Sequence, residues 1–283
     1  MRKLGVHTSI AGGLPQSLHR AGALGCTTMQ IFSHNPRSWN LTGIPEAEAA
    51  LFKKTRKEIF GRSPVFIHAC YLINLISGND EVREKSVWML GEEMRRADAL
   101  GVDYVVMHTG SAGGPAAPEG KYQMAILSES IRAVLRAGNF RAGLLLENTA
   151  GSRGELTSSV KDLGAVVRQA GAAGLCFDTC HGFVSGYDIR SKGGLKELER
   201  EIRESPGPGR VKLIHLNDSK GELGSGLDRH EHLGKGRIGA EGLRTFLSHP
   251  FFRDVPAVLE TPKKEETDDP MNLKAASLLM RNV

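Results

Sequence analysis

Short apolar runs alternate with longer amphipathic stretches along the chain, and this alternation predicts a repeating order of strand and helix. The short runs predict strands at residues 4–8, 28–33, 65–69, 104–109, 143–149, 175–181, 211–217 and 257–261. The longer stretches predict helices at residues 14–24, 45–60, 81–100, 121–138, 157–173, 193–204, 240–248 and 270–281. Pro45 at the start of one predicted helix, and Gly101 and Gly174 after the ends of two others, agree with these boundaries.

Eight such units in 283 residues amount to about 35 residues per strand and helix, which is typical of an eightfold barrel. The sequence therefore predicts an α/β protein with a single catalytic domain over residues 1–283, folded as a (β/α)8 TIM barrel. A doubly wound open sheet would show the same alternation. The positions of the polar residues help to distinguish these two folds.

Acidic residues and histidines stand at the carboxyl ends of six predicted strands. They are His68, His108, Glu147, Asp178 with His181, His215 and Glu260. Asp228 and His230 lie in the long Gly-rich loop that follows the seventh strand. An open sheet collects its site at a switch point between two strands, whereas a barrel collects residues from many strand ends. The distribution favours the barrel, with a multinuclear metal site at the C-terminal ends of its strands.

Each of these positions also has a simpler interpretation. A single histidine such as His68 or His108 at a strand end is more often a hydrogen-bonded structural residue than a ligand. A carboxylate at the end of a buried strand costs several kcal/mol unless it is paired or binds a metal. Several such residues at matching strand ends favour a metal site. The mixture of imidazole and carboxylate indicates zinc or manganese in preference to magnesium or calcium.

Composition adds little about function. The net charge of +5 and the pI near 9.0 suit a polyanionic partner without requiring one. No apolar stretch approaches the roughly 20 residues of a membrane span, and the first residues enter a strand at once. We therefore expect no membrane association, no signal peptide and a cytoplasmic protein. The cysteines, which form no CxxC pair, are expected to be buried thiols: Cys26, Cys70, Cys176 and Cys180.

Seven motifs between Gly5 and Glu260 carry a resemblance to a known family. They are GVHTSIAGGL, QIFSHNPRSW, HACYLINL, ENTAG, DTCHGFVSGYDI, HLNDSKGELGSGLDRHEHLGKGRIG and LETP. Together they resemble the endonuclease IV family of apurinic/apyrimidinic (AP) endonucleases. The resemblance implies a monomeric DNA-repair enzyme that hydrolyses the phosphodiester 5′ to an abasic site in double-stranded DNA. The products would be 3′-hydroxyl and 5′-deoxyribose phosphate ends.

The resemblance also implies three zinc ions per chain, with manganese as an alternative at one site. The first zinc would be bound by His68, His108 and Glu147. Glu147 would bridge to the second zinc, whose other ligands would be Asp178, His215 and Glu260. The third zinc would be bound by His181, Asp228 and His230. Glu147 would in addition serve as a catalytic base toward the attacking water.

Three further residues, Arg37, Tyr71 and Leu72, occupy positions that enter the DNA by this resemblance. Without it, Tyr71 and Leu72 would be interpreted as packing residues at the start of a helix. Several nearby positions depart from the family: Cys70 replaces a proline or serine, and His34 a lysine or glycine. Lys235 and Gly226 also replace residues that are common there, a glutamate and an arginine. None of the departures falls on an implied ligand.

Two other functions are compatible with parts of this pattern. A sugar isomerase or epimerase that depends on divalent metal uses the same barrel and also gathers acidic residues and histidines at strand ends. It would not need His181, Asp228 and His230 to converge on a third metal. A non-catalytic binder of damaged DNA would have structural zinc sites, which favour four cysteine or histidine ligands over carboxylates.

Overall fold

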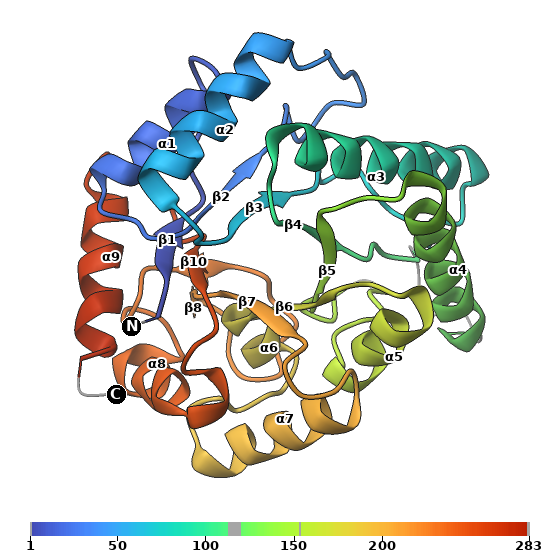
Figure 1. Ribbon diagram of the computed structural model, residues 1–283. Helices are drawn as coiled ribbons and strands as arrows, with labels where there is room; N and C mark the ends of the chain where they lie inside the picture. The colour runs from blue at the N-terminus through green and yellow to red at the C-terminus, as the bar shows by residue number, and fades with distance from the viewer. Residues whose placement is uncertain (1, 113–119, 153, 282–283) are drawn as a thin grey trace.

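The computed structural model describes residues 2–112, 120–152 and 154–281, and eight of its strands form one parallel sheet. These strands are β1 Leu4–Val6, β2 Met29–Phe32, β3 Val65–His68, β4 Tyr104–His108, β5 Gly143–Glu147, β6 Gly174–Asp178, β7 Val211–His215 and β10 Ala257–Leu259. Their order in the sheet is β1-β10-β7-β6-β5-β4-β3-β2. A parallel bridge between His7 and Gln30 joins β1 to β2, the first and last strands in this order. The sheet therefore closes into the predicted barrel (Figure 1).

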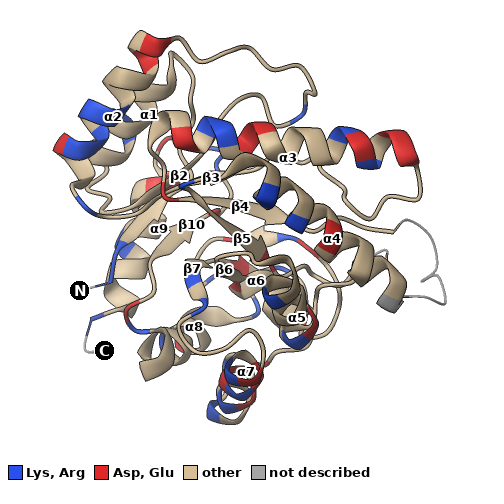
Figure 2. Cartoon of the chain, turned by 45° about the vertical axis from the view of Figure 1, so that its right-hand side comes forward, with Lys and Arg blue, Asp and Glu red and all other residues tan. Residues whose placement is uncertain are grey.

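Most helices surround the barrel on its outside, whereas α6 (Thr179–Val184) lies inside this ring, directly after the end of β6 (Figure 1). The helices are α1 Leu14–Ala23, α2 Glu46–Phe60, α3 Asp80–Leu100, α4 Gly120–Gly138, α5 Val160–Ala170, α6 Thr179–Val184, α7 Lys192–Glu204, α8 Gly239–Ser248 and α9 Asp268–Leu279, with a 3-10 helix at Pro250–Phe252. The side-chain oxygen of Asn79 caps α3 by accepting from the amide of Val82, and Gly101 ends this helix in the left-handed conformation. Acidic and basic residues are interspersed on α2, α3 and α7 (Figure 2). None of the helices in the described part of the chain is long and apolar enough to cross a membrane.

The barrel interior has its own small hydrophobic cluster, separate from the large core between strands and helices. It contains one fully buried residue from each of six strands: Phe66, Val106, Leu145, Cys176, Leu213 and Val258. Successive side chains on a strand point to opposite faces, so the residue two positions further on also points inward. That rule places six of the predicted ligands in one layer above this cluster: His68, His108, Glu147, Asp178, His215 and Glu260.

Three local predictions were wrong. The strand predicted at 175–181 ends at Asp178, because the Asp178 carboxylate accepts from the His181 amide at 2.8 Å and starts α6. Gly174 opens β6, whereas α5 ends at Gly171 in the left-handed conformation. The loop after β7 contains a short antiparallel pair, β8 Asp218–Ser219 and β9 His230–Glu231.

Candidate metal centre

Glu147 lies at the centre of the inward-facing layer and contacts four imidazoles. Its Oε2 atom is 3.2 Å from His68 Nε2 and 3.4 Å from His108 Nε2. Its Oε1 atom is 2.8 Å from His215 Nδ1 and 3.4 Å from His181 Nδ1. Two ligand atoms bound to one tetrahedral zinc are separated by about 3.3 Å, so the spacings from Glu147 to His68, His108 and His215 need little change to accept cations. The two oxygens of Glu147 therefore face two different groups of histidines.

The charge state of Glu147 depends on these neighbours. Burial alone would raise the pKa of Glu147, but His215, His108 and His181 outweigh burial and hold the pKa well below its ordinary value. Burial alone would likewise raise the pKa of Asp228, yet His181, His230 and His108 lower that pKa to about 2. Both carboxylates are therefore ionised at neutral pH, as metal ligands must be.

A second group of residues meets at the open side of the layer. Asp228 Oδ1 lies 3.3 Å from His181 Nε2 and 3.6 Å from His230 Nε2, and these two nitrogens are 3.4 Å apart. His181 Nδ1 is 3.0 Å from the backbone carbonyl of Asn148, and His230 Nδ1 is 3.0 Å from that of Glu260. A carbonyl oxygen only accepts hydrogen bonds, so both rings carry a proton on Nδ1 and turn Nε2 toward Asp228. This donor set fits a cation.

Asp178 and Glu260 connect the two groups. Asp178 Oδ2 is 3.6 Å from His230 Nε2, and Glu260 Oε2 is 3.3 Å from His215 Nδ1. The ligand-type atoms of Asp178, His181 and His230 lie within 4.8 Å of one another, as do those of His68, His108 and Glu147. All nine residues that the sequence singled out as ligands thus form one continuous set of contacts. Seven of them are buried or nearly so, while His108 and Asp228 reach toward solvent.

Sequence reasoning missed three amides that orient these residues. The Gln30 carbonyl oxygen lies 2.9 Å from His215 Nε2, and the Gln30 amide donates to Glu260 Oε1 at 2.6 Å. The Asn217 amide donates to Asp178 Oδ2 at 2.7 Å, and the side-chain oxygen of Asn148 accepts from the backbone amide of Asp178 at 2.7 Å. Asn148 and Asn217 each stand directly or closely after a ligand in the chain, which is a signal that the sequence offered. Gln30 offered none beyond being polar within an apolar strand.

The three predicted DNA-contact residues lie on two neighbouring loops beside the centre. The Tyr71 amide donates to the Pro36 carbonyl at 3.0 Å, which joins the loop after β3 to the loop that carries Arg37. Arg37 and Tyr71 are exposed, Tyr71 at 58%, whereas Leu72 is half-buried against the core. Tyr71 also stacks edge-on against Phe32, with ring centroids 5.1 Å apart. Tyr71 is therefore held by Phe32 and by the Pro36 carbonyl while much of its surface remains exposed.

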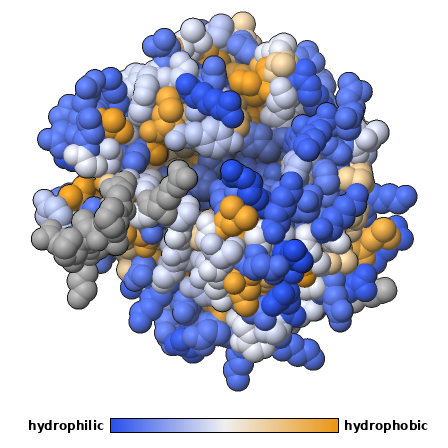
Figure 3. Space-filling view, turned by 180° about the vertical axis from the view of Figure 1, so that it is seen from behind, coloured by the Kyte–Doolittle hydropathy of each residue, from blue (hydrophilic) through white to orange (hydrophobic). Residues whose placement is uncertain are grey.

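A groove of about 620 Å³ leads from these loops to the layer of ligands. Its walls include Phe32, Tyr71, Lys263, His230 and Glu260. That volume is in the range of sites for small molecules and single nucleotides. Figure 3, a view from behind the barrel, shows a hollow lined by hydrophilic residues near the centre of that end. A group that enters this groove would reach His230 and Glu260.

Comparisons with known proteins agree with this geometry. The family model described as the xylose isomerase-like TIM barrel matches residues 18–283. The chain is 41% identical to probable endonuclease 4 of Methanoculleus marisnigri over 273 residues, covering 95% of this chain and 96% of that protein. It is 38% identical to probable endonuclease 4 of Aquifex aeolicus, covering 100% of this chain and 99% of that protein. The crystal structure of endonuclease IV from Thermus thermophilus has a TM-score of 0.88 at 36% identity, covering 99% of this chain and 100% of that chain.

The chain is thus a xylose isomerase-like TIM barrel protein with a cluster of metal-ligand side chains inside the barrel mouth. Within that class, it belongs to the endonuclease IV family, as its motifs predicted, and it is an enzyme of that family. A D-psicose 3-epimerase is 14% identical with a TM-score of 0.67, and this likeness concerns the fold alone.

Proposed function

We propose that this chain is a metal-dependent AP endonuclease that hydrolyses the phosphodiester 5′ to an abasic site in double-stranded DNA. The observation that carries the proposal is the convergence of His181, Asp228 and His230 beside the Glu147 group. A sugar isomerase on this fold needs one or two cations and has no use for this additional set. We further propose that the enzyme acts as a single-domain monomer in the cytoplasm, where its DNA substrate would be found.

We assign the ligands to three zinc ions, with manganese as an alternative at one site. The first ion would be bound by His68, His108 and Glu147. The second would be bound by Glu147, Asp178, His215 and Glu260. The third would be bound by His181, Asp228 and His230. The assignment is supported by the contacts of Glu147, whose Oε2 faces the first set and whose Oε1 faces His215.

The chemistry of hydrolysis requires a nucleophile, a neutralised phosphate and a stabilised leaving group. Bound zinc would lower the pKa of coordinated water toward about 7 and offset the charge on phosphate. Glu147 is ionised and lies at the centre of the inward-facing layer, so its carboxylate would be the group that orients the attacking water and accepts its proton. Addition of water across the P–O3′ bond would leave a 3′-hydroxyl and a 5′-deoxyribose phosphate.

Recognition of the lesion would depend on the loops beside the groove. An abasic nucleotide has no base to stack, so opening the duplex costs least at that position. Tyr71 is exposed and braced by Phe32, which suits a side chain that enters an opened stack. Leu72 is half-buried, so it would contribute a smaller part of this wedge. Arg37 is exposed on the adjoining loop and would contact phosphate or base.

The test is incubation with a duplex that contains one synthetic abasic site, beside the same duplex with an intact nucleotide. We expect a single nick in the damaged strand only, and extension of the upstream fragment by a DNA polymerase because its end is a 3′-hydroxyl. Treatment with a strong chelator should abolish the nick, and added zinc should restore it. Cleavage on the 3′ side, or no cleavage by the zinc-loaded enzyme, would overturn the proposal.

A further inference from the structure

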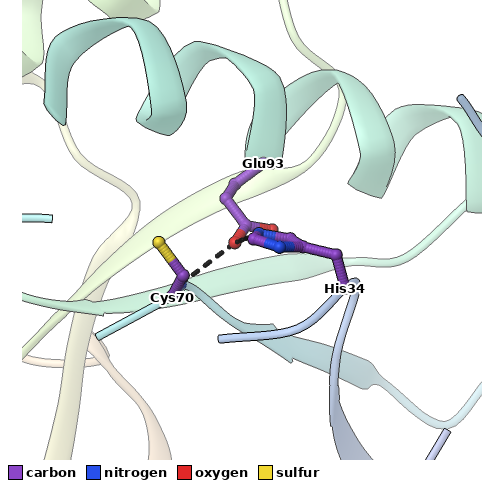
Figure 4. A group of neighbouring side chains, drawn as sticks. All are labelled: His34, Cys70 and Glu93. Atoms are coloured by element: carbon purple, nitrogen blue, oxygen red, sulfur yellow. Dashed lines mark hydrogen bonds and ion pairs between the residues drawn. The ribbon is translucent and has the colours of Figure 1, made fainter. Parts of the chain in front are cut away.

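A second cluster of ligand-type side chains lies outside the metal centre, where α3 covers the loops after β2 and β3. His34, Cys70 and Glu93 each offer one ligand atom, and these atoms lie within 4.8 Å of one another. Figure 4 shows Glu93 extending from α3 toward His34 and Cys70 on the two loops below. The three residues are 8%, 4% and 0% exposed. None of them belongs to the nine residues of the metal centre.

The combination of thiol, imidazole and carboxylate is characteristic of a zinc site. Zinc bonds of about 2.0–2.3 Å place tetrahedral ligand atoms roughly 3.3–3.8 Å apart, so a contraction of about 1 Å would suffice here. Magnesium and calcium prefer oxygen alone and would not use the sulfur and nitrogen atoms. The Ser33 hydroxyl donates to Glu93 Oε2 at 2.7 Å and accepts from the Arg96 guanidinium at 2.8 Å, so three protein ligands are offered and a water molecule would take the fourth position.

The existing hydrogen bonds leave His34 available for this role. His34 Nε2 is 3.0 Å from Glu93 Oε1, while His34 Nδ1 is buried and has no hydrogen-bond partner among the described residues. Exchange of the one hydrogen bond for a metal bond would therefore disturb no other polar contact of the ring. The Cys70 amide also donates to Glu93 Oε1 at 3.0 Å, so the carboxylate is already held between the two loops.

We propose that His34, Cys70 and Glu93 bind a Zn²⁺ ion that is separate from the metal centre and ties both DNA-facing loops to α3. His34 lies three residues before Arg37, and Cys70 directly precedes Tyr71. The Tyr71 amide and the Pro36 carbonyl already join these loops. A metal ion at their base would restrict the positions of Arg37 and Tyr71 relative to the groove. Its function is thus structural, and it takes no part in hydrolysis.

Cobalt provides a direct probe, because Co²⁺ bound to a thiolate absorbs strongly in the near ultraviolet, whereas Co²⁺ bound to nitrogen and oxygen does not. Chelator-treated protein reloaded with Co²⁺ should show this band, and Cys70→Ser should remove it. Cys26→Ser is the matched control, since Cys26 is a buried thiol away from both clusters and should keep the band. Cys176 and Cys180 lie beside the metal centre, so a band of unchanged intensity in Cys70→Ser would come from them and overturn the proposal. Absence of the band in the wild-type protein would overturn it as well.

Elemental analysis gives a second readout that does not depend on the metal content of the main centre. Cys70→Ser and His34→Gln, each checked for native circular dichroism, should each contain one zinc ion per chain fewer than the wild type. The test uses the difference in zinc content between wild type and variant. It therefore remains valid even if the main centre does not bind three zinc ions. Equal zinc contents in the wild type and both variants would overturn the proposal.

Discussion

His181 and His230 point their Nε2 atoms at each other across 3.4 Å, while a backbone carbonyl accepts the Nδ1 proton of each ring. Two lone pairs and the Asp228 carboxylate therefore meet at one place, and this arrangement requires either an added proton or a metal ion. Burial alone would lower the pKa of His181, but Asp178, Asp228 and Glu147 raise it well above its ordinary value. We infer that a proton on His181 competes with a metal ion for this position.

Removal of this third set should affect one metal only. Asp228 and His230 serve the proposed third site alone, so Asp228→Ala combined with His230→Ala should reduce zinc from three ions to about two in the main centre. Elemental analysis of protein purified without chelator measures this loss. A double substitution at the exposed, paired residues Glu197 and Arg200 on α7 is a suitable control. Loss of all metal from the Asp228/His230 variant would contradict three separable sites.

Glu147→Gln tests the central carboxylate. The amide keeps the shape of the side chain but removes the charge that faces four imidazoles. We expect turnover to fall by at least about a hundredfold, with binding of abasic DNA retained. Single-turnover cleavage and filter binding measure the two quantities separately. Near-normal turnover would exclude Glu147 as a base or bridge, and loss of DNA binding together with metal would indicate a structural role.

The exposed loops permit a separation of lesion recognition from general attraction to DNA. Tyr71→Ala with Leu72→Ala should reduce the preference for abasic over intact duplex and leave nonspecific affinity nearly unchanged. Removal of a phosphate contact behaves differently, since it weakens binding to every duplex and reduces the salt slope by about one unit. We expect Arg37→Ala to lower the preference for abasic over intact duplex more than it lowers the dependence of DNA affinity on salt concentration. Filter binding across a salt series measures both, and a shallower slope with unchanged preference would make Arg37 a phosphate anchor.

Metal retention should depend on pH in a defined direction. Burial alone would lower the pKa of His215, but Cys176, Glu147 and Glu260 raise it well above the ordinary value of 6.5, as happens for His181. Zinc requires the unprotonated ring, so its affinity is lost as pH falls through these raised pKa values, and the loss begins above pH 6.5. Zinc affinity measured against a competing chelator, over a pH interval that starts well above pH 6.5, should fall as the pH is lowered and should begin to fall before pH 6.5 is reached. A flat profile over that interval would contradict the raised pKa values.

Much of the fold followed from the apolar runs, because strands of a parallel barrel are buried on both faces. Each ligand at a strand end lies two residues after a residue of the small hydrophobic cluster in the barrel interior, as His68 follows Phe66. This spacing of two residues can be recognised in the sequence. The residue at which β6 ends could not be predicted from the sequence. The run from Leu175 to Val184 is largely apolar, and only the bond from the His181 amide to Asp178 shows where strand becomes helix.

The role of Gln30 in orienting the metal ligands could not be predicted from the sequence. Gln30 lies on β2, far in sequence from His215 on β7 and Glu260 after β10. Barrel closure through the His7–Gln30 bridge brings it against both of them. A local sequence pattern cannot predict this contact, because barrel closure depends on the spacing and stagger of all eight strands.

Gln30 should therefore matter for metal affinity although it binds no metal. Its carbonyl oxygen accepts the His215 Nε2 proton and leaves Nδ1 facing Glu147, while its amide orients Glu260. Gln30→Leu keeps the approximate volume and removes both hydrogen bonds. Loss of such supporting contacts typically costs about 10–100-fold in metal affinity, and we expect this effect at the site that contains His215. Gln16→Leu, at an exposed glutamine of α1, is the matched control. Zinc titration against a competing chelator measures the change, and equal affinities in the two variants would show that His215 is oriented without Gln30.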